Sequence, residues 1–284
     1  MFDIKDNLKP GLYCVSTPIG NLGDVTLRSL HILKNSELIL SEDTRITKIL
    51  LSKYKINNVK LISNHKFNEK KNISIVKKLI GSKKIISIVS DAGTPALSDP
   101  GRIIINECIK EKYNIFPVPG PSAITSAISI SGFSDKYYFC GFLPDKKGSI
   151  ENLFDEISKY NCTIVFFISP KKINKLKALI TKYFSQREIV ICREMTKLFE
   201  DYVRVKVNNL ENIKILEKGE ITVVISQKYY TQNSLQIIEE SVKKKIEKLI
   251  KIMSIKDVVS KISLENNIQK KVIYNYCLKK KNEI

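Results

Sequence analysis

Residues 84–101 of the chain read KIISIVSDAGTPALSDPG, and this stretch decides the fold. Its first six residues have the apolar, β-branched composition of a buried strand. The next twelve contain two acidic residues, two glycines and two prolines among small side chains. Such a segment is either a long turn or a binding loop at the carboxyl end of a parallel strand, and the surrounding sequence has to decide between the two.

Strand and helix patterns alternate around this stretch. The expected strands cover residues 12–17, 38–41, 60–64, 84–89 and 115–118, and the helical patterns that follow them cover residues 26–35, 45–54, 69–82, 101–112 and 122–130. Five β-α units in succession predict a parallel sheet with helices on both faces. Ligands of such sheets bind outside the carboxyl ends of the strands, which favours the binding loop.

Three of the loops that follow these strands are rich in glycine and proline: residues 17–24 (TPIGNLGD), 91–100 and 117–122 (PVPGPS). Glycine lets a ligand approach the backbone closely, and proline stiffens the loop. We expect the three loops to lie on one edge of the sheet and to offer backbone amides to a ligand.

The second half of the chain has a different character. Residues 131–147 interrupt the alternation and are predicted to be a linker. The helices and strands expected after it, at 151–160, 163–168, 172–184, 188–192, 202–207, 210–217 and 221–225, predict a mixed sheet with helices. We therefore divide the chain into an N-terminal α/β domain (1–131), a C-terminal α/β domain (132–230) and a basic helical extension (231–284).

The extension is expected to be helical from about Thr231, with a helix-turn-helix-like pair at 255–264 and 268–280 joined by a break at 265–267. An apolar seam is predicted between the paired helices, formed by Val258, Val259, Ile262, Ile273, Tyr276 and Cys277. Residues 231–284 hold twelve lysines and six acidic residues, a net charge of +6. A solvated helical face and a contact with RNA explain this charge equally well.

Composition narrows the class of protein. No apolar run approaches the roughly 18 residues of a membrane span, and the first six residues mix both charges, unlike a secretory leader; we expect a cytoplasmic protein with no membrane contact. The six cysteines are far apart and there are two histidines, so neither a metal site nor a disulfide framework is expected. The net charge of +19 permits a polyanionic partner, but arginine supplies only six of the 48 basic residues and Ile and Asn abound, as an A/T codon bias would produce.

Common catalytic motifs are missing. The sequence has no G-x-x-x-x-G-K-[ST], no G-x-G-x-x-G after the first strand, no G-x-S-x-G and no H-E-x-x-H. What remains is a site of backbone amides, small side chains and a few acids. Such a site suits a polar cofactor that brings its own reactivity.

Five motifs, in order, carry a family resemblance: residues 17–24, 41–45 (SEDTR), 89–95 with 99–101 (VSDAGTP, DPG), 119–121 (PGP) and 141–144 (GFLP). Together they resemble the RNA-directed members of the tetrapyrrole-methylase-like class of S-adenosylmethionine-dependent methyltransferases. The resemblance runs from about Gly11 to Ile225. It implies methylation of the ribose 2′-hydroxyl of a cytidine in the decoding region of 16S rRNA, by a two-domain homodimer acting on the small ribosomal subunit.

The resemblance also implies that S-adenosyl-L-methionine lies between the two domains. The residues expected to touch it are Pro18, Gly20, Asp91, Ala92, Gly93, Thr94, Pro95, Leu97, Gly120, Ser122, Ala123, Phe167, Ile168, Met195, Val224 and Ile225. The chain departs from the family at 169–172, where SPKK takes the place of a Glu and a later Arg, so the contacts of those residues are not carried over.

A ribose hydroxyl becomes a good nucleophile only when a base takes its proton. The candidate bases are Glu42, Asp43 and Asp91, with Arg45 or Lys197 placing a phosphate; we assign Glu42, Asp43 and Arg45 to the catalytic site. Acids in the first turn of a helix also act as caps, and this interpretation of Glu42 and Asp43 stays open. So do two other functions: a methyltransferase of the same class acting on a tetrapyrrole or a protein side chain, and an RNA-binding ribosome assembly factor without catalysis.

Overall fold

The computed structural model describes residues 8–228, 238–266, 268 and 270–281. The chain divides into two compact units, Met1–Lys228 and Tyr229–Ile284, and each is described by itself. The helix expected from Thr231 to residue 237, the predicted domain boundary at 230/231 and Asn267 of the predicted break lie outside the described residues.

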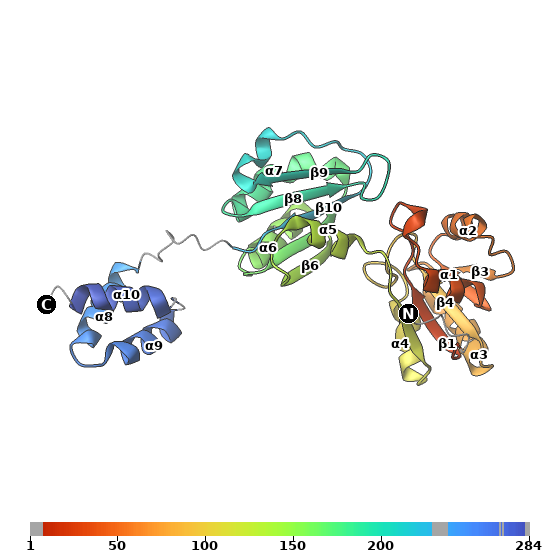
Figure 1. The fold of residues 1–284 in the computed structure, drawn as a ribbon, viewed down its shortest axis with the longest axis horizontal. Coiled ribbons are helices and arrows are strands. Elements are labelled where there is room, and N and C mark those ends of the chain that lie inside the picture. Colours follow the sequence, from red (N-terminus) through yellow and green to blue (C-terminus); the bar gives the residue numbers. More distant parts are fainter. Residues whose placement is uncertain (1–7, 229–237, 267, 269, 282–284) are drawn as a thin grey trace. The chain divides into compact units, whose positions relative to one another are not determined.

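The first sheet of the larger unit has five parallel strands, as predicted (Figure 1). The strands are β1 (Gly11–Val15), β2 (Leu38–Ser41), β3 (Lys60–Ser63), β4 (Ile85–Val89) and β5 (Ile115–Val118). Their order is β3-β2-β4-β1-β5, so β4, the strand in the opening stretch, is the central one. Its carboxyl end therefore lies between those of β1 and β2.

Helices cover both faces of this sheet, also as predicted. On one face, α1 (Leu27–Lys34) and α2 (Thr44–Lys53) bury Ile32, Leu33, Leu50 and Leu51 against Val15, Ile39 and Val89. On the other, α3 (Glu69–Gly81) and α4 (Arg102–Lys110) bury Val76, Ile80, Ile104 and Cys108 against Leu12, Leu40 and Ile88. Alternate residues of each strand thus face opposite cores, which holds the strand ends in a fixed register.

The second sheet is mixed, as predicted, with the order β6-β7-β10-β8-β9 (Figure 1). Its strands are β6 (Tyr137–Phe142), β7 (Thr163–Ile168), β8 (Glu188–Arg193), β9 (Asp201–Lys206) and β10 (Ile221–Ile225). Only the β6–β7 pair is parallel; β10 runs antiparallel to both β7 and β8. Because β10 runs antiparallel to β7, the start of β10 lies beside the end of β7. The start of β10 is therefore the end that comes near the loops of the first sheet.

The structure corrects the predicted linker at 131–147. Residues 137–142 (YYFCGF) form strand β6, paired with β7. Glycine and proline on either side of this run suggested an interruption of the fold, but the aromatic residues themselves have strong strand propensity. Phe139 packs edge-on against Phe167 of β7, with ring centroids 5.1 Å apart.

The helix predicted at 210–217 is also wrong. A 3₁₀ helix, η2 (Val207–Asn212), is followed by non-helical chain. Side chains of α7 (Pro170–Phe184) bind this segment: the Asn174 amide donates to the Ile215 carbonyl over 2.8 Å, and the Lys177 ammonium donates to the carbonyl of Ile213. These tertiary hydrogen bonds replace the intrahelical ones that the helix would have made.

Helices cover both faces of the second sheet as well. One face carries α6 (Lys147–Ile157), α7 and η2. The other carries α5 (Ala123–Ser131), whose Ile124 and Ala127 lie in one buried cluster with Val165, Val190 and Val224. The domain boundary at 131/132 stays a prediction, and the packing of α5 favours a division before Ala123.

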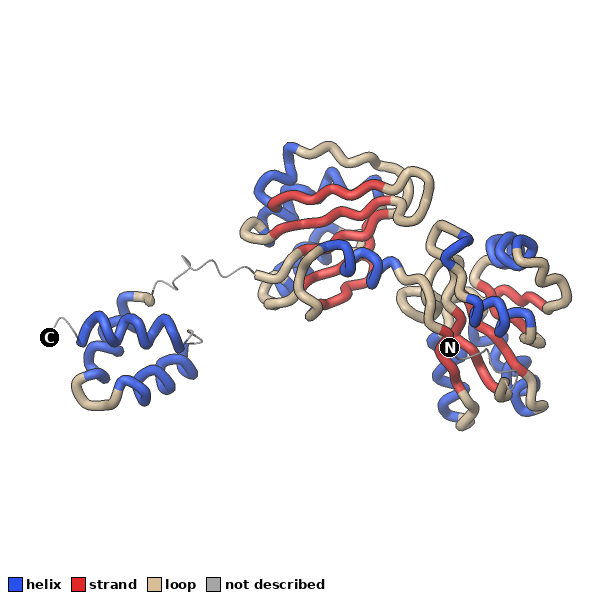
Figure 2. The backbone as a smooth tube through the Cα atoms, viewed as in Figure 1, coloured by secondary structure: helices blue, strands red, loops and turns tan. Residues whose placement is uncertain are grey.

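The smaller unit is helical in its described residues, with α8 (Glu240–Ile250), α9 (Ile255–Asn266) and α10 (Lys270–Lys281) (Figure 2). The predicted apolar seam is confirmed, because Val258, Val259, Ile262, Ile273 and Cys277 are buried together with Tyr276 packed against them. The predicted break at Glu265 and Asn266 is wrong, since α9 continues through both residues. Among the described helices of the chain, none is long and apolar enough to cross a membrane.

Candidate functional site

The three glycine- and proline-rich loops meet at one edge of the first sheet, as predicted. Thr17 and Gly93 exchange two backbone hydrogen bonds of 2.9 and 3.0 Å, which joins the loops after β1 and β4. The hydroxyl groups of Ser16 and Thr94 are 3.0 Å apart, and the Thr94 hydroxyl donates to the Pro121 carbonyl over 3.4 Å. Hydrogen bonds to the loops after β1 and β5 therefore hold the loop after β4 in place.

A pocket of about 400 Å³, here called the loop pocket, opens at this edge. Nine of the predicted cofactor residues line it: Asp91, Ala92, Gly93, Thr94, Leu97, Ser122, Ala123, Phe167 and Ile168. The predicted catalytic residue Glu42 lines it too. Ile19, which belongs to the predicted Pro18–Gly20 loop, is also part of the lining. The remaining lining residues were not predicted: Asp99, Ile124, Phe142, Ser169, Pro170, Gly219, Glu220, Ile221 and Thr222.

The loop after β1 lies beside the pocket. Ile19 lines it, but Pro18 and Gly20 do not. Gly20 is instead in tight contact with a second loop, because a Cβ atom there would lie 2.4 Å from Cγ of Lys197. The backbone amide of Asn21 also donates to the Thr196 hydroxyl over 3.0 Å. Met195, likewise predicted to touch the cofactor, is buried in one cluster with Ile19 and supports the pocket wall from behind.

Val224 and Ile225, predicted to touch the cofactor, are fully buried within β10 and do not line the pocket. The prediction used the carboxyl end of the strand, as is correct for a parallel sheet. Because β10 is antiparallel to β7, its first residue, Ile221, pairs with Ile168 at the end of β7. The start of β10 and the residues before it, 219–222, therefore line the pocket in place of its end.

Two further predicted cofactor residues support the loops without lining the pocket. Pro95 is buried within the loop after β4. Gly120 allows the loop after β5 to approach β1, since a Cβ atom there would lie 2.9 Å from Cβ of Ser16. The segment 169–172, where the chain departs from the family, begins α7; Ser169 and Pro170 line the pocket and Lys172 forms an ion pair with Asp145.

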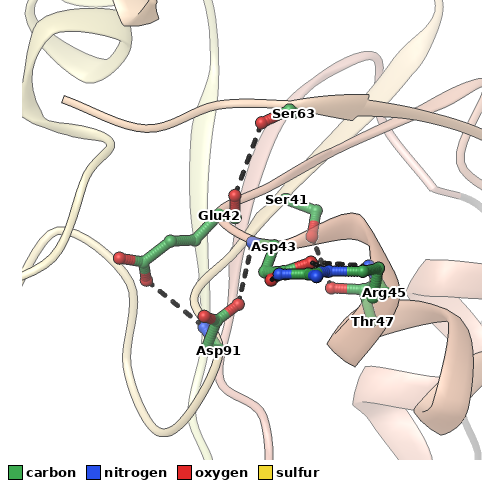
Figure 3. Close-up of polar contacts among 7 residues, drawn as sticks. All are labelled: Ser41, Glu42, Asp43, Arg45, Thr47, Ser63 and Asp91. Carbon is green, nitrogen blue, oxygen red and sulfur yellow. Dashed lines mark hydrogen bonds and ion pairs between the residues drawn. The ribbon is translucent and has the colours of Figure 1, made fainter. Parts of the chain in front are cut away.

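Figure 3 shows how the acidic residues after β2 diverge. Glu42 extends toward the loop after β4, where its Oε2 accepts a long hydrogen bond of 3.5 Å from the Asp91 amide. Asp91 returns a bond, because its Oδ1 accepts from the Asp43 amide over 2.8 Å. Burial, followed by the charge of Asp91, raises the pKa of Glu42 above its usual value. Burial also raises the pKa of Asp91, although the hydrogen bond from the Asp43 amide acts in the opposite direction.

Asp43 points the other way and caps α2. Its Oδ1 accepts from the Arg45 amide over 2.8 Å, and its Oδ2 pairs with the Arg45 guanidinium over 2.6 Å (Figure 3). The hydrogen bond from the Arg45 side chain lowers the pKa of Asp43 to about 2. A carboxylate of such low pKa is a weak base, so the capping interpretation is the better one for Asp43. Lys197, the other candidate for placing a phosphate, pairs with Glu194 and Glu220.

Asp99, like Glu220, is an acidic residue that was not predicted to belong to the site. It lines the loop pocket, and burial together with the charges of Glu42 and Asp91 raises its pKa to about 7. The signal was present in the opening stretch, as the second of its two acids, eight residues after the first. What the sequence did not reveal is that the loop folds back and returns Asp99 to the neighbourhood of Glu42.

In the described part of the chain, no three His, Cys, Asp or Glu side chains are grouped so that they could hold a metal ion. The site therefore consists of a pocket with apolar walls, backbone groups of three loops and a cluster of carboxyl groups. It can hold a polar organic ligand and exchange a proton with it.

The family model for tetrapyrrole (corrin/porphyrin) methylases matches residues 11–211, and the chain belongs to this family. A solved structure with the same fold is uroporphyrin-III C-methyl transferase from Thermus thermophilus complexed with S-adenyl homocysteine. That likeness has a TM-score of 0.55 and 12% sequence identity, and it covers 76% of this chain and 97% of the other.

Within the family, the similar sequences include two proteins named ribosomal RNA small subunit methyltransferase I. The protein from Thermotoga maritima is 46% identical over 222 residues, which cover 76% of this chain and 98% of that protein. The protein from Rickettsia prowazekii is 36% identical over 287 residues, which cover 96% of this chain and 98% of that protein. The chain groups with this branch of the family.

Proposed function

We propose that this protein transfers a methyl group from S-adenosyl-L-methionine to the ribose 2′-hydroxyl of a cytidine in the 16S rRNA of the small ribosomal subunit. The observation that carries the proposal is the loop pocket, in which Glu42 and Asp91 follow the carboxyl ends of β2 and β4. The relatives named ribosomal RNA small subunit methyltransferase I support the substrate class.

The residues of the loop pocket fit S-adenosylmethionine. A volume of about 400 Å³ is in the range of small-molecule sites. The apolar side chains of Ile19, Leu97 and Phe167 suit the adenine ring, and the carboxyl groups of Asp91 and Glu220 suit the positive charges of the methionine part. We propose that residues 91–94, 122–123, 167–168 and 219–222 hold it.

When bound, S-adenosylmethionine supplies a methyl group on a sulfonium, which makes the methyl carbon electrophilic and leaves a neutral thioether. The protein has to orient the hydroxyl and take up its proton. Glu42, Asp91 and Asp99 all line the pocket and have raised pKa values. Asp91 already accepts a hydrogen bond from the Asp43 amide, which leaves Glu42 and Asp99 as the candidate bases. A carboxylate with a raised pKa is a more effective base than Asp43, and a positioned base contributes about 10²- to 10⁴-fold.

We further propose that the enzyme is a cytoplasmic homodimer, as the family resemblance implies. Separately, Arg45 is the remaining candidate for a phosphate contact. Its side chain is 88% exposed, although it forms an ion pair with Asp43. The oligomeric state is measured by light scattering at several protein concentrations; a constant monomer mass would refute the dimer.

The function is tested by incubating the full chain with labelled S-adenosylmethionine and undermethylated small subunits, then mapping the product by mass spectrometry. We expect a ribose-methylated cytidine in 16S rRNA. Parallel incubations with uroporphyrinogen and with protein extract test the other substrates of this class, and label in either one without label in rRNA overturns the proposal. Calorimetry with S-adenosylmethionine alone tests the non-catalytic alternative, which predicts no binding.

A further inference from the structure

A second pocket adjoins the loop pocket. This pocket, here called the Phe67 pocket, has a volume of about 630 Å³ and is lined by Glu42, His65, Lys66, Phe67, Glu69, Ser98, Asp99, Pro100 and Arg102. Glu42 and Asp99 line both pockets. A molecule in the Phe67 pocket and a molecule in the loop pocket would therefore meet at these two carboxyl groups.

The lining of the Phe67 pocket includes an exposed aromatic ring. Phe67, in the loop between β3 and α3, is 81% exposed, although phenylalanine is usually buried. The His65 ring approaches it edge-on at 6.0 Å between centroids, and the Lys66 ammonium lies 4.9 Å from the centre of the Phe67 ring. The Lys66 ammonium lies over one face of the ring. An exposed aromatic ring with a cation close to it is an arrangement on which proteins stack the unpaired bases of RNA.

Four basic residues belong to the Phe67 pocket or follow it directly in the chain. Lys66 and Arg102 line the pocket, and Lys70 and Lys71 follow in the first turn of α3; all four are exposed. Among the described residues, none of the four takes part in an ion pair. Cations that the protein itself does not neutralise are available to phosphate groups.

The third carboxylate of the Phe67 pocket, that of Glu69, already accepts hydrogen bonds within the protein. Glu69 is 4% exposed, and its Oε1 accepts hydrogen bonds from the amides of Ile103 and Ile104 over 2.8 and 3.1 Å, at the start of α4. It therefore fixes α4, and with it Arg102, at the edge of the pocket. Glu42 and Asp99 remain as the acids that can accept from a bound hydroxyl.

We propose that the Phe67 pocket receives the target nucleotide of the RNA substrate, extruded from its strand, with the base stacked on Phe67, its phosphates beside Lys66 and Arg102, and its ribose at Glu42 and Asp99. This inference rests on the proposed function and adds the place and the mode of nucleotide binding. The nucleotide has to leave its helix or stack, because its 2′-hydroxyl has to reach Glu42 and Asp99, which are both half-buried.

The test compares the full-length wild type with Phe67→Ala, Lys66→Met and the control Phe199→Ala. Phe199 is also an exposed phenylalanine, at 69%, and lines neither pocket. Methyl transfer to undermethylated small subunits gives KM for the subunit, and calorimetry gives Kd for S-adenosylmethionine. We expect KM to rise about 5- to 100-fold in Phe67→Ala, the loss of one stacked base, with Kd for the cofactor unchanged. Lys66→Met should raise KM and weaken its dependence on salt.

A wild-type KM in Phe67→Ala, or an equal rise of KM in Phe199→Ala, overturns the proposal. A second readout does not depend on catalysis: 16S rRNA carrying the photoreactive 5-iodocytidine in place of cytidine, and so at the target position itself, is cross-linked to the protein, and the attached peptide is identified. Attachment at residues 65–67 supports the pocket even where no methyl transfer is seen, in which case the proposed reaction fails and the binding site stands. Methyl transfer with attachment only elsewhere refutes the pocket and leaves the reaction intact.

Discussion

The carboxylate of Asp91 accepts a hydrogen bond from the backbone amide of Asp43 over 2.8 Å. This bond joins the loop after β4 to the start of α2, two segments 48 residues apart in the chain. We predict that Asp91→Ala lowers the free energy of unfolding by about 1–3 kcal/mol, because the partly buried amide loses its acceptor. Asp91→Asn keeps an acceptor oxygen and should stay within about 1 kcal/mol of the wild type in chemical denaturation. Equal losses in both variants would contradict the role of the bond.

Removal of the charge of Glu42 and removal of the charge of Asp43 should have different effects on kcat for methyl transfer, although the two residues are neighbours in the chain. Glu42 lines both pockets, so we predict that Glu42→Gln lowers kcat for methyl transfer by about 10²- to 10⁴-fold if it is the base. Asp43→Asn keeps an oxygen that can cap α2 and should retain kcat within a factor of about two. Single-turnover rates at saturating cofactor measure both. Full activity in Glu42→Gln would leave Asp99 as the candidate base.

Much of the first sheet was predictable because each strand and helix carries its own local pattern. The hydrophobic periodicity and the residue types of β4 and α4 are typical of a strand and a helix. The loop between them is recognisable by its glycines and prolines. The order of the strands was not predictable, since it depends on pairing between distant segments. That order places β2 beside β4 and thereby brings Glu42 to Asp91.

The second half of the site was predicted less well for the same reason. Val224 and Ile225 were chosen by position along the chain, and only the antiparallel pairing of β10 with β7 shows that Ile221 lies at the pocket. The place of Asp99 in the pocket was not predicted, because it depends on the path of the loop after β4. In that loop Ala96 and Ser98 both have positive φ angles, 63° and 73°. Such conformations are set by tertiary contacts and have no signature in residue type at these positions.

Gly93 provides a test of the loop's conformation. Its φ angle is +78°, in the region that favours glycine, and it exchanges two hydrogen bonds with Thr17. We predict that Gly93→Ala costs about 1–2 kcal/mol of stability through backbone strain and weakens cofactor binding. Gly148→Ala is the matched control, because a Cβ atom at Gly148 meets nothing within 4 Å and its φ angle is not positive. Thermal unfolding and calorimetry measure both variants, and similar behaviour of the two would show that the loop tolerates a different conformation.

The smaller unit should be dispensable for cofactor binding. Its buried apolar residues, such as Val258 and Ile273, pack on one another, and all residues that line the loop pocket lie within Met1–Lys228. We predict that a chain ending at Lys228 binds S-adenosylmethionine with a Kd within about twofold of the full chain. If the extension contacts RNA, the shortened chain should show a higher KM for the small subunit and a weaker salt dependence; if it is only a solvated helical face, KM should be unchanged. A loss of cofactor binding would show that the extension supports the pocket.

Asp99 makes stability depend on pH. Burial, with the charges of Glu42 and Asp91, raises its pKa in the folded protein from 3.8 to about 7, while a hydrogen bond from Ser90 acts against the rise. Between these two values the folded state binds more protons than the unfolded state, so this residue lowers the free energy of unfolding as pH rises from about 4 to about 7. Asp99→Asn removes the charge, and we predict that it stabilises the protein by about 1–2 kcal/mol at pH 8, allowing for solvent screening, and by little at pH 4. The same variant should remove an inflection near pH 7 from the methyl-transfer rate if Asp99 is the base. Urea unfolding at the two pH values measures the first effect without reference to activity, and an equal gain at both would show that the raised pKa is not its cause.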